Sequence, residues 1–571
     1  MPTDRVSAWI SARELPLLER ITNKLHVGAT LVRAGVIRPT RPDRLVATLI
    51  TLNRWGPTPA AGYTGAAIRY PDEPAVIDEL GTLTFAEVHR RTNGLAHGLS
   101  DHGISEGDSV AILCRNHRGF IDATVALSKL GAHALYLNTA FAAPQITDVV
   151  AREKPIALIY DEEFTGMVSE AAKGHKRFIA WRDGESKPGD PVLEDLIAGG
   201  DPGDVVPPAE PGRVVILTSG TTGTPKGAAR SQPETLDPAA ALLSRIPLRA
   251  RETTMIAAPM FHSWGFAHFT LGMGLSSTLV LRRKFDPEGT LSATAEHRAT
   301  ALAVVPVMLQ RILELPAETI ERYDLHALRV IAASGSALPG ELATKVMDRF
   351  GDVLYNLYGS TEVAWATIAT PEDLRAAPGT AGRPPRGTIV KLFDQEGHEV
   401  DPGDTGRIFV GNEMLFEGYT GGGGKDVIAG LMSTGDVGHF DEDGRLFVDG
   451  RDDEMIVSGG ENVFPREVED LLSRHDAIDE AAVIGVEDDE FGQRLKAFVV
   501  CAAGTTLTED EVKTYVKSNL ARFKVPREVV FLVQLPRNAT GKVLKRELAE
   551  AGADGKARDT QAASPAGTGK D

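Results

Sequence analysis

The sequence has few of the residues that mark exported or metal-binding proteins. Only two of its 571 residues are cysteines, and they lie far apart in the apolar runs SVAILC and KAFVVC, without the spacing of metal ligands. Cys114 and Cys501 are therefore expected to be buried, reduced thiols. The first residues lack the succession of basic, apolar and small residues that forms a signal peptide. These absences predict a cytoplasmic protein.

Positive charge is also scarce. The chain has 61 Lys and Arg against 79 Asp and Glu, which gives a formal net charge of -18. A general nucleic-acid-binding protein needs a basic surface to neutralise phosphates, so this composition argues against one. The hydrophobic fraction of 42% is sufficient to bury a core, and the length indicates more than one domain.

One long stretch lacks charged residues altogether. Residues 255–281 could span a bilayer on length alone, but they include Pro259, His262 and His268. Because lipid leaves such polar groups unsatisfied, the stretch indicates a buried strand, loop and helix that pass close to a ligand.

The first 56 residues reverse the charge of the rest, with nine Lys and Arg against four Asp and Glu. Apolar residues recur at helical spacing from Leu17 to Leu25, and a second apolar run extends from Leu45 to Leu52. Two interpretations stay open. Either these helices pack on the body through Leu17, Ile21, Leu25 and Leu49, or the segment attaches weakly to the inner face of an anionic membrane.

Short strands and helices alternate from Pro74 onward, which predicts an α/β fold. Residues 388–448 are rich in strand and turn signals and predict a β subdomain within the large domain. We expect a basic, helical N-terminal extension over 1–60, a large multi-subdomain α/β domain over 61–450 and a small α+β domain over 451–549. The tail from 550 to 571 has no large apolar residue and is expected to be disordered.

The sequence VVILTSGTTGTPKGA, at 214–228, is suited to binding phosphate. Its glycines allow successive backbone N–H groups to face an anion, and its hydroxyls and lysine add donors and charge. These side chains belong to Thr218, Ser219, Thr221, Thr222 and Lys226, with Gly220 among the glycines. No Gly directly precedes Lys226 and no Ser or Thr follows it, so the loop is not a Walker A motif. A mobile linker is the alternative.

This loop resembles the phosphate-binding signature of the adenylate-forming superfamily, and six further motifs follow in the expected order. They are PMFHSWG at 259–265, ASGSALPG at 333–340, NLYGSTE at 356–362, STGD at 433–436, GRDDEMIVSGGENVFPREVE at 450–469 and RNATGKVLKREL at 537–548. The resemblance covers about residues 60–549. It implies a small C-terminal domain that moves, and ATP, Mg²⁺ and coenzyme A as ligands.

The resemblance also implies a nucleotide site. Glu362 would bind the Mg²⁺ that ATP brings, and Thr361 would contact the α-phosphate. Tyr358 would stack on adenine, with Asn356 near its amino group. The remaining expected nucleotide contacts are Gly335, Ser336 and Ala337 beside the base, Gly359 next to Tyr358, and Asp436 and Arg451 at the ribose.

Lys542 resembles the lysine that bridges the substrate carboxylate and the α-phosphate, where negative charge must be matched during adenylate formation. With Thr218, His262 and Glu362 it completes the expected catalytic set. The resemblance further implies that the small domain rotates about Asp453 for the second step. The turn containing Gly459 and Gly460 would then line the channel for the coenzyme A thiol.

Three positions bear on the acid. Amino-acid-activating relatives place Asp where this chain has His262, so an amino acid is disfavoured. Acetate-activating relatives place Trp at Gly359, so glycine here predicts an open acyl tunnel. The apolar residues after Glu362, together with Trp264, would line that tunnel. The sequence thus predicts an AMP-forming acyl-CoA synthetase for a medium-chain or long-chain fatty acid.

Other functions remain open. An aryl acid could replace the fatty acid. A fatty acyl-AMP ligase that transfers to a carrier protein would typically carry an insertion between Glu362 and Asp436, which we do not find. A peptide-synthetase adenylation protein would need a carrier domain, and a non-enzymatic protein of the same fold predicts loss of Lys542 or Glu362, both of which are present.

Overall fold

A computed structural model describes residues 17–38, 41–184, 189–218, 226–230, 235–454, 456–458, 461–488, 492–538 and 541–553. The chain divides into two compact units. The larger unit contains Met1–Val448 and Ala539–Gly541, and the smaller unit contains Asp449–Asn538 and Lys542–Asp571. The first boundary falls two residues before the expected one at 450.

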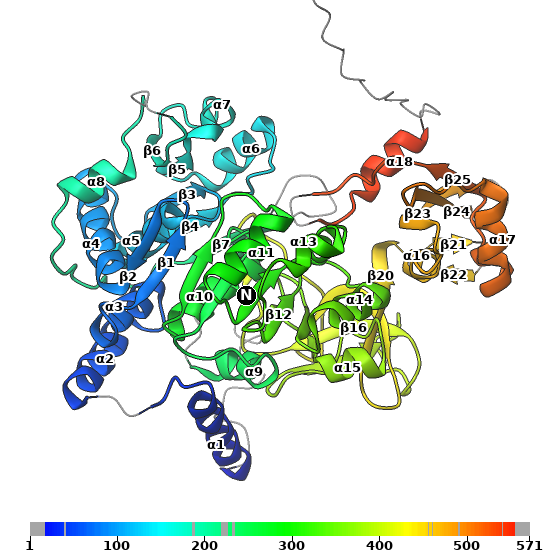
Figure 1. Cartoon of the computed structure of the whole chain (residues 1–571), viewed down its shortest axis with the longest axis horizontal. Helices are drawn as coiled ribbons and strands as arrows, with labels where there is room; N and C mark the ends of the chain where they lie inside the picture. The colour runs from blue at the N-terminus through cyan, green and yellow to red at the C-terminus, as the bar shows by residue number, and fades with distance from the viewer. Residues whose placement is uncertain are drawn as a thin grey trace, which may run out of the picture. The chain divides into compact units, whose positions relative to one another are not determined.

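The larger unit contains an eight-stranded sheet in the order β14-β13-β12-β11-β9-β10-β1-β2. Of these strands, β1, β2 and β12 are labelled in Figure 1. Its six central strands are parallel, and β14 and β2 run antiparallel at the edges. The strands are β1 (Pro74–Asp78), β2 (Gly81–Thr84), β9 (Thr253–Ile256), β10 (Thr278–Leu281), β11 (Ala301–Val304), β12 (Val330–Ala333), β13 (Leu354–Tyr358) and β14 (Thr367–Ala369).

A second sheet of the larger unit has seven strands in the order β17-β8-β7-β4-β3-β5-β6. From β7 to β6 all pairs are parallel, whereas β8 and β17 are antiparallel. Its strands are β3 (Ser109–Leu113), β4 (His133–Tyr136), β5 (Ala157–Asp161), β6 (Lys176–Trp181), β7 (Val214–Thr218), β8 (Lys226–Arg230) and β17 (Gly418–Tyr419).

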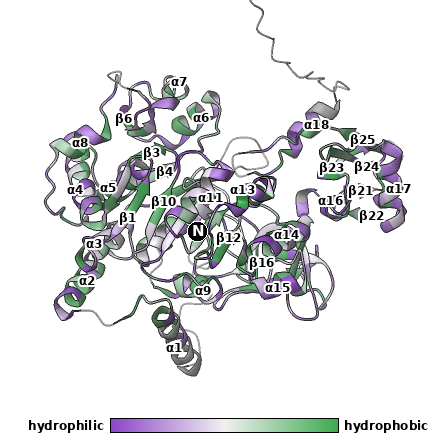
Figure 2. Cartoon of the chain, viewed as in Figure 1, coloured by the Kyte–Doolittle hydropathy of each residue, from purple (hydrophilic) through white to green (hydrophobic). Residues whose placement is uncertain are grey.

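Helices pack on both sheets, as the alternating pattern predicts. The helix that follows β2 starts with a capping box, in which Thr84 and Glu87 each bind the other's backbone N–H. The helices are α3 (Pro59–Arg69), α4 (Phe85–Asp101), α5 (Arg118–Leu130), α6 (Ala143–Glu153), α7 (Thr165–Val168), α8 (Leu193–Gly199), α9 (Asp237–Arg245), α10 (Ser263–Gly274), α11 (Pro287–Glu296), α12 (Pro306–Leu313), α13 (Ala317–Glu321), α14 (Gly340–Phe350) and α15 (Pro371–Ala376). Figure 2 shows hydrophobic residues concentrated on strands such as β1 and β10.

One hydrophobic core joins the two sheets. It includes Val76 and Leu279 from the eight-stranded sheet and Val110 and Ile112 from the seven-stranded sheet, all fully buried. Burial of such apolar surface is the main stabilising contribution to the larger unit. The two sheets therefore belong to the same folded body.

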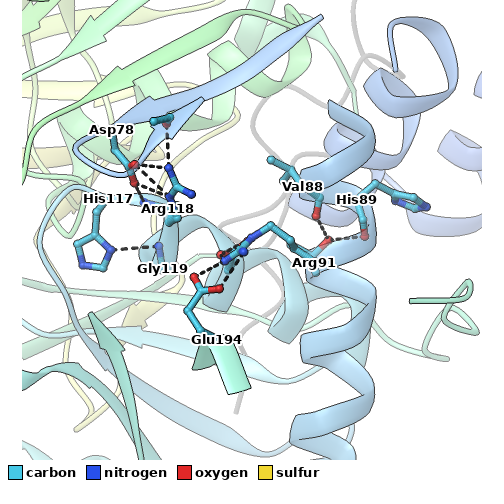
Figure 3. A network of polar contacts seen from close by, with 11 residues as sticks. Asp78, Val88, His89, Arg91, His117, Arg118, Gly119 and Glu194 are labelled. Atoms are coloured by element: carbon cyan, nitrogen blue, oxygen red, sulfur yellow. Dashed lines mark hydrogen bonds and ion pairs between the residues drawn. The ribbon is translucent and has the colours of Figure 1, made fainter. Parts of the chain in front are cut away.

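Polar side chains just after β3 also connect the sheets. Arg118, at the start of α5, forms a buried ion pair with Asp78 of β1 (Figure 3). Asn116 donates its amide N–H groups to the carbonyls of Ile256 (3.2 Å), the last residue of β9, and Ala258 (2.9 Å), two residues after it. Because these contacts are buried and well paired, they fix the position of one sheet on the other.

The β subdomain expected over 388–448 is a five-stranded antiparallel sheet. Its strands are β15 (Ile389–Phe393), β16 (Gly406–Gly411), β18 (Val427–Ile428), β19 (Leu431–Phe440) and β20 (Leu446–Arg451). This sheet has a core of its own around Leu392, Ile408 and Val410.

The smaller unit combines a five-stranded sheet with three helices around a separate core. The elements are β21 (Ile456–Ser458), β22 (Glu461–Val463), α16 (Pro465–Leu472), β23 (Ile478–Asp488), β24 (Gly492–Cys501), α17 (Glu509–Asn519), β25 (Glu528–Phe531) and α18 (Lys545–Ala553). The expectation of disorder from residue 550 is wrong for its first four residues, which end α18. Residues 554–571 lie outside the described part.

Two helices precede the α/β body, α1 (Leu17–Arg33) and α2 (Pro42–Trp55). The expectation that Leu25 and Leu49 pack on the body is wrong, because their side chains are 67% and 57% exposed. Residues 255–281 form β9, α10 and β10, as their polar content predicts. Over the ranges that the structure describes, no helix is both long and apolar enough to cross a membrane.

Of the two cysteines, only Cys114 is fully buried. Cys501 is half-buried, contrary to expectation, because it is the last residue of β24, where the chain leaves the sheet.

Candidate active site

Three expected site segments follow parallel strands of the eight-stranded sheet. His262 comes after β9, Ser336 after β12 and Glu362 after β13. These strands run in the same direction in the order β13-β12-β11-β9. Since parallel strands place their carboxyl ends at one edge, the topology gathers the three segments where α/β sheets bind ligands.

The residues expected at adenine and ribose are linked to each other. The Tyr358 hydroxyl donates to Asp436 Oδ2 at 2.6 Å and lies 3.2 Å from Thr434 Oγ1. The backbone N–H of Asp436 donates to the same Thr434 hydroxyl. The carboxylate of Asp436, on β19, is thereby fixed beside the ring of Tyr358, at the end of β13.

Glu362 is linked to the strand that carries Lys226. The Tyr419 hydroxyl donates to Glu362 Oε1 at 2.8 Å, and Lys226 Nζ lies 5.2 Å from the Tyr419 ring centroid. Tyr419 pairs with Ala228 in β8. Sequence reasoning missed Tyr419, because a lone tyrosine 57 residues after its partner has no local signal.

Glu362 offers a carboxylate that fits a Mg²⁺ ion. The Glu362 carboxylate is 8% exposed, and it is a hard oxygen donor of the kind that Mg²⁺ prefers. Mg²⁺ usually takes one or two carboxylates and fills its other positions with water and substrate phosphates. A metal carried by ATP therefore matches this single carboxylate.

Asn356 and Gly335 have the features of a ligand contact. Asn356 is 7% exposed, and its side-chain oxygen has no hydrogen-bond partner within the described part of the chain. A buried acceptor of this kind is costly unless a ligand or water satisfies it. Gly335 has a φ of 97°, which explains the glycine, and Ser336 and Ala337 follow it directly.

The expectation that Gly359 opens an acyl tunnel is wrong. A Cβ at this position would lie 2.2 Å from the backbone oxygen of Ala364 and 2.6 Å from Cα of Trp365. Glycine is required because two backbone segments touch there. The side of Gly359 that would carry a side chain is therefore filled by protein.

His262 is the residue before α10, and its side chain is half-buried. Burial lowers the pKa of His262 to about 4, so its imidazole is neutral at pH 7. Its Nε2 lies 3.5 Å from the amide nitrogen of Asn138, at the end of β4. The neighbouring Trp264 is a core residue, whose ring N–H donates to the carbonyls of Val304 and Ala332. Trp264 therefore does not line an open tunnel, contrary to the expectation from the sequence.

Trp365 lines a cavity of about 260 Å³ under α1. The other walls include His26, Asp237, Arg386 and Glu413. Because most of these side chains are polar or charged, the cavity is poorly suited to an alkyl chain.

The expected residues of the smaller unit lie in strands and turns. Lys542 belongs to a turn in which its backbone N–H donates to Asn538 Oδ1 at 2.9 Å. Arg451 ends β20 and lies in the same unit. Gly459 and Gly460 lie outside the described residues.

Most of the phosphate loop also lies outside them, namely Ser219, Gly220, Thr221 and Thr222. Thr218 ends β7 and pairs with Lys226 across the strands that border the loop. Thr361 lies between Tyr358 and Glu362 in the segment after β13.

A further group, Cys114, His117 and Asp161, has its polar atoms within 4.8 Å of one another. These atoms are already paired. Gly119 N–H donates to His117 Nδ1 at 3.0 Å, so His117 Nε2 carries the proton that it donates to Asp161 at 2.8 Å. This buried group stabilises the fold.

Two family models match the chain. Residues 64–420 match the AMP-binding enzyme family, and residues 467–542 match the AMP-binding enzyme C-terminal domain. The chain is 34% identical over 471 residues to a feruloyl-CoA synthase of Amycolatopsis sp, covering 82% of this chain and 93% of that protein. It is 30% identical to the fatty acid–[acyl-carrier-protein] ligase ScoC of Streptomyces coeruleorubidus, covering 84% and 93%.

A solved structure of similar fold is ATP-bound MatB from Rhodopseudomonas palustris. It is 27% identical, with a TM-score of 0.78, and the match covers 87% of this chain and 99% of that one. The likeness includes the large α/β domain and the smaller C-terminal domain.

Proposed function

Because this chain belongs to the AMP-binding enzyme family, we propose that it joins a medium-chain or long-chain fatty acid to coenzyme A in two steps. ATP and coenzyme A are its substrates. In the first step the acid's carboxylate attacks the α-phosphorus of ATP, and pyrophosphate leaves. In the second step the coenzyme A thiol loses its proton and attacks the acyl carbonyl carbon, and AMP leaves.

The linked side chains of the larger unit support the nucleotide part of this proposal. Asp436 would accept the ribose hydroxyls, and the unpaired oxygen of Asn356 would accept from the adenine amino group. The Tyr358 ring would stack on the base. Glu362 would hold Mg²⁺, which neutralises phosphate charge during adenylate formation.

Lys542 would act in the first step only. Its ammonium would lie between the attacking carboxylate and the α-phosphate and stabilise the charge that builds on the phosphate oxygens. A rotation of the smaller unit would then remove Lys542 and admit the thiol. The separate core of the smaller unit supports its movement as one body.

We choose an apolar acid because the surroundings of His262 are uncharged. With a pKa of about 4, His262 brings no positive charge to the acyl site at pH 7, and Phe261 and Trp264 next to it are buried. A second carboxylate or an ammonium on the acid would have to lose its hydration there without a counter-charge. The distal end of the acid is therefore uncharged, as an alkyl chain is.

An aryl acid is the second candidate. The ring centroids of Phe261 and His262 lie 4.7 Å apart, and those of Phe266 and Tyr136 lie 5.1 Å apart. Such rings could pack against an aromatic acid as well as against an alkyl chain.

A matched panel of acids tests the proposal. Full-length protein would receive ATP, Mg²⁺ and coenzyme A with dodecanoate, dodecanedioate, 12-aminododecanoate or ferulate, and kcat/KM would be measured for acyl-adenylate and thioester formation. We expect dodecanoate to exceed both charged analogues by at least about 100-fold, because each buries an unpaired charge.

Each other outcome has a distinct meaning. A preference for ferulate would replace the fatty acid by an aryl acid. Acyl-adenylate without thioester would indicate transfer to a carrier protein. Equal use of dodecanedioate would contradict the apolar acyl site.

A further inference from the structure

Helix α2 presents its hydrophobic side to solvent. Leu45, Val46, Leu49, Ile50 and Leu52 are all between 45% and 57% exposed. Their spacing of one, three and four residues places them on one continuous side of a helix. We call these five residues the α2 apolar face.

The opposite side of α2 is small or polar and packs on the larger unit. Arg44 donates to the carbonyl of Arg69 in α3, and Thr51 is buried. Ala47 and Thr48 lie between them on the same side and are half-buried. A surface helix normally buries its apolar side and exposes its polar side. In α2 this arrangement is inverted, so the apolar face is available to another surface.

Three further apolar residues are exposed on α1 and in the turn after it. Leu25, Val32 and Ile37 are 67%, 57% and 51% exposed. With the α2 apolar face they account for eight of the fifteen large hydrophobic residues exposed in the part of the chain that the structure describes. The α2 apolar face is continuous, and a continuous exposed apolar face indicates a binding surface, whereas scattered exposed apolar residues do not.

The charges around this surface favour an anionic partner. Residues 22–56 contain six Lys and Arg and one Asp, although the whole chain has a net charge of -18. The acidic residue, Asp43, pairs with Arg41 in a fully solvated contact, which is a weak interaction that lipid phosphates can replace. Two copies that met through this surface would bring basic residues together, so self-association is disfavoured.

We propose that the α2 apolar face, with the basic residues around it, docks the protein on an anionic lipid bilayer. The helix would lie in the plane of the membrane with its five apolar side chains between the headgroups, and the basic side chains would contact lipid phosphates. This proposal is independent of which acid the enzyme activates.

Vesicle co-sedimentation tests the proposal. Full-length protein would be mixed with vesicles of phosphatidylglycerol and phosphatidylcholine, or of phosphatidylcholine alone, at low and high salt. We expect binding to the anionic vesicles that weakens with salt. The variant Leu45→Ser with Leu49→Ser should bind about 10-fold less, because both side chains leave the apolar face without disturbing a buried contact.

Leu80→Ser is the matched control, since Leu80 is 60% exposed on the turn between β1 and β2 and should not affect binding. The circular dichroism spectrum and melting temperature of each variant report on folding. Wild-type protein that stays in the supernatant at low salt, or a double variant that binds like wild type, would overturn the proposal. So would a concentration-dependent dimer that the double variant loses while vesicle binding persists.

Discussion

The larger and the smaller unit contribute to the proposed reaction in different ways. In the larger unit, Tyr358 is hydrogen-bonded to Asp436, and Tyr419 is hydrogen-bonded to Glu362, so these side chains are positioned before a nucleotide arrives. In the smaller unit, Lys542 stands in a turn whose described contact holds its backbone. In the proposed reaction, nucleotide binding thus rests on contacts within the larger unit, whereas the first chemical step also requires Lys542 of the smaller unit.

The largest expected effect is a loss of adenylate formation, and it distinguishes the role of the smaller unit from that of the larger unit. Lys542→Ala should lower adenylate formation by roughly 10³-fold, because a cation at the transition state is lost. Thioester formation from supplied acyl-adenylate should stay near the wild-type rate. Single-turnover measurements of each half-reaction check this, and an equal loss in both would show that Lys542 does not act in one step alone.

A smaller loss is expected when Glu362, the proposed Mg²⁺ ligand of the larger unit, loses its charge. Glu362→Gln keeps the shape of the side chain but removes its charge, and should lower adenylate formation by about 100-fold through weaker Mg²⁺ binding. The rate should recover in part as Mg²⁺ is raised. A Mg²⁺ titration of both proteins measures this effect, with Tyr419→Phe as a variant that keeps the carboxylate. Loss without any change in Mg²⁺ dependence would assign Glu362 another role.

The contact between the adenine and ribose positions should matter less. Tyr358→Phe keeps the ring for stacking and removes the hydroxyl that holds Asp436, so we expect KM for ATP to rise about 10-fold with little change in kcat. Steady-state kinetics at saturating acid tests this expectation. A fall in kcat at unchanged KM would mean that the hydroxyl acts in the chemistry.

The smallest effect concerns stability. Gly359→Ala introduces a methyl group against the backbone of Ala364 and Trp365 and should lower the free energy of unfolding by about 1–3 kcal/mol. Acid preference among molecules that still turn over should not change. Thermal melts and the acid panel measure the two quantities. A shifted chain-length preference at unchanged stability would restore the tunnel interpretation.

The sequence predicted the order of the elements well, because strand and helix periodicities are local. The alternation of strands and helices expected from Pro74 onward is present, and the apolar runs SVAILC and KAFVVC lie largely in β3 and β24. The segments with His262, Ser336 and Glu362 follow neighbouring parallel strands and so lie at one edge of the sheet, since that edge follows from topology.

Other features depend on neighbours that are distant in the sequence. Whether the space beside Gly359 is open is decided by the backbone at Trp365, which the motif does not specify. The pairing of Tyr419 with Glu362 requires β17 to lie on β8. For α2, the apolar spacing predicts a helix, but which side is buried depends on the surface of α3.

The contacts of Asn116 and Arg118 have a consequence for how the chain melts. They join two sheets that also share one core, so neither sheet can lose its structure without exposing the interior of the other. The larger unit should then unfold in a single calorimetric transition, and the smaller unit, with its own core, in another. The border between the two cooperatively unfolding parts would therefore lie near Val448, where the units meet along the chain, and not between the two sheets.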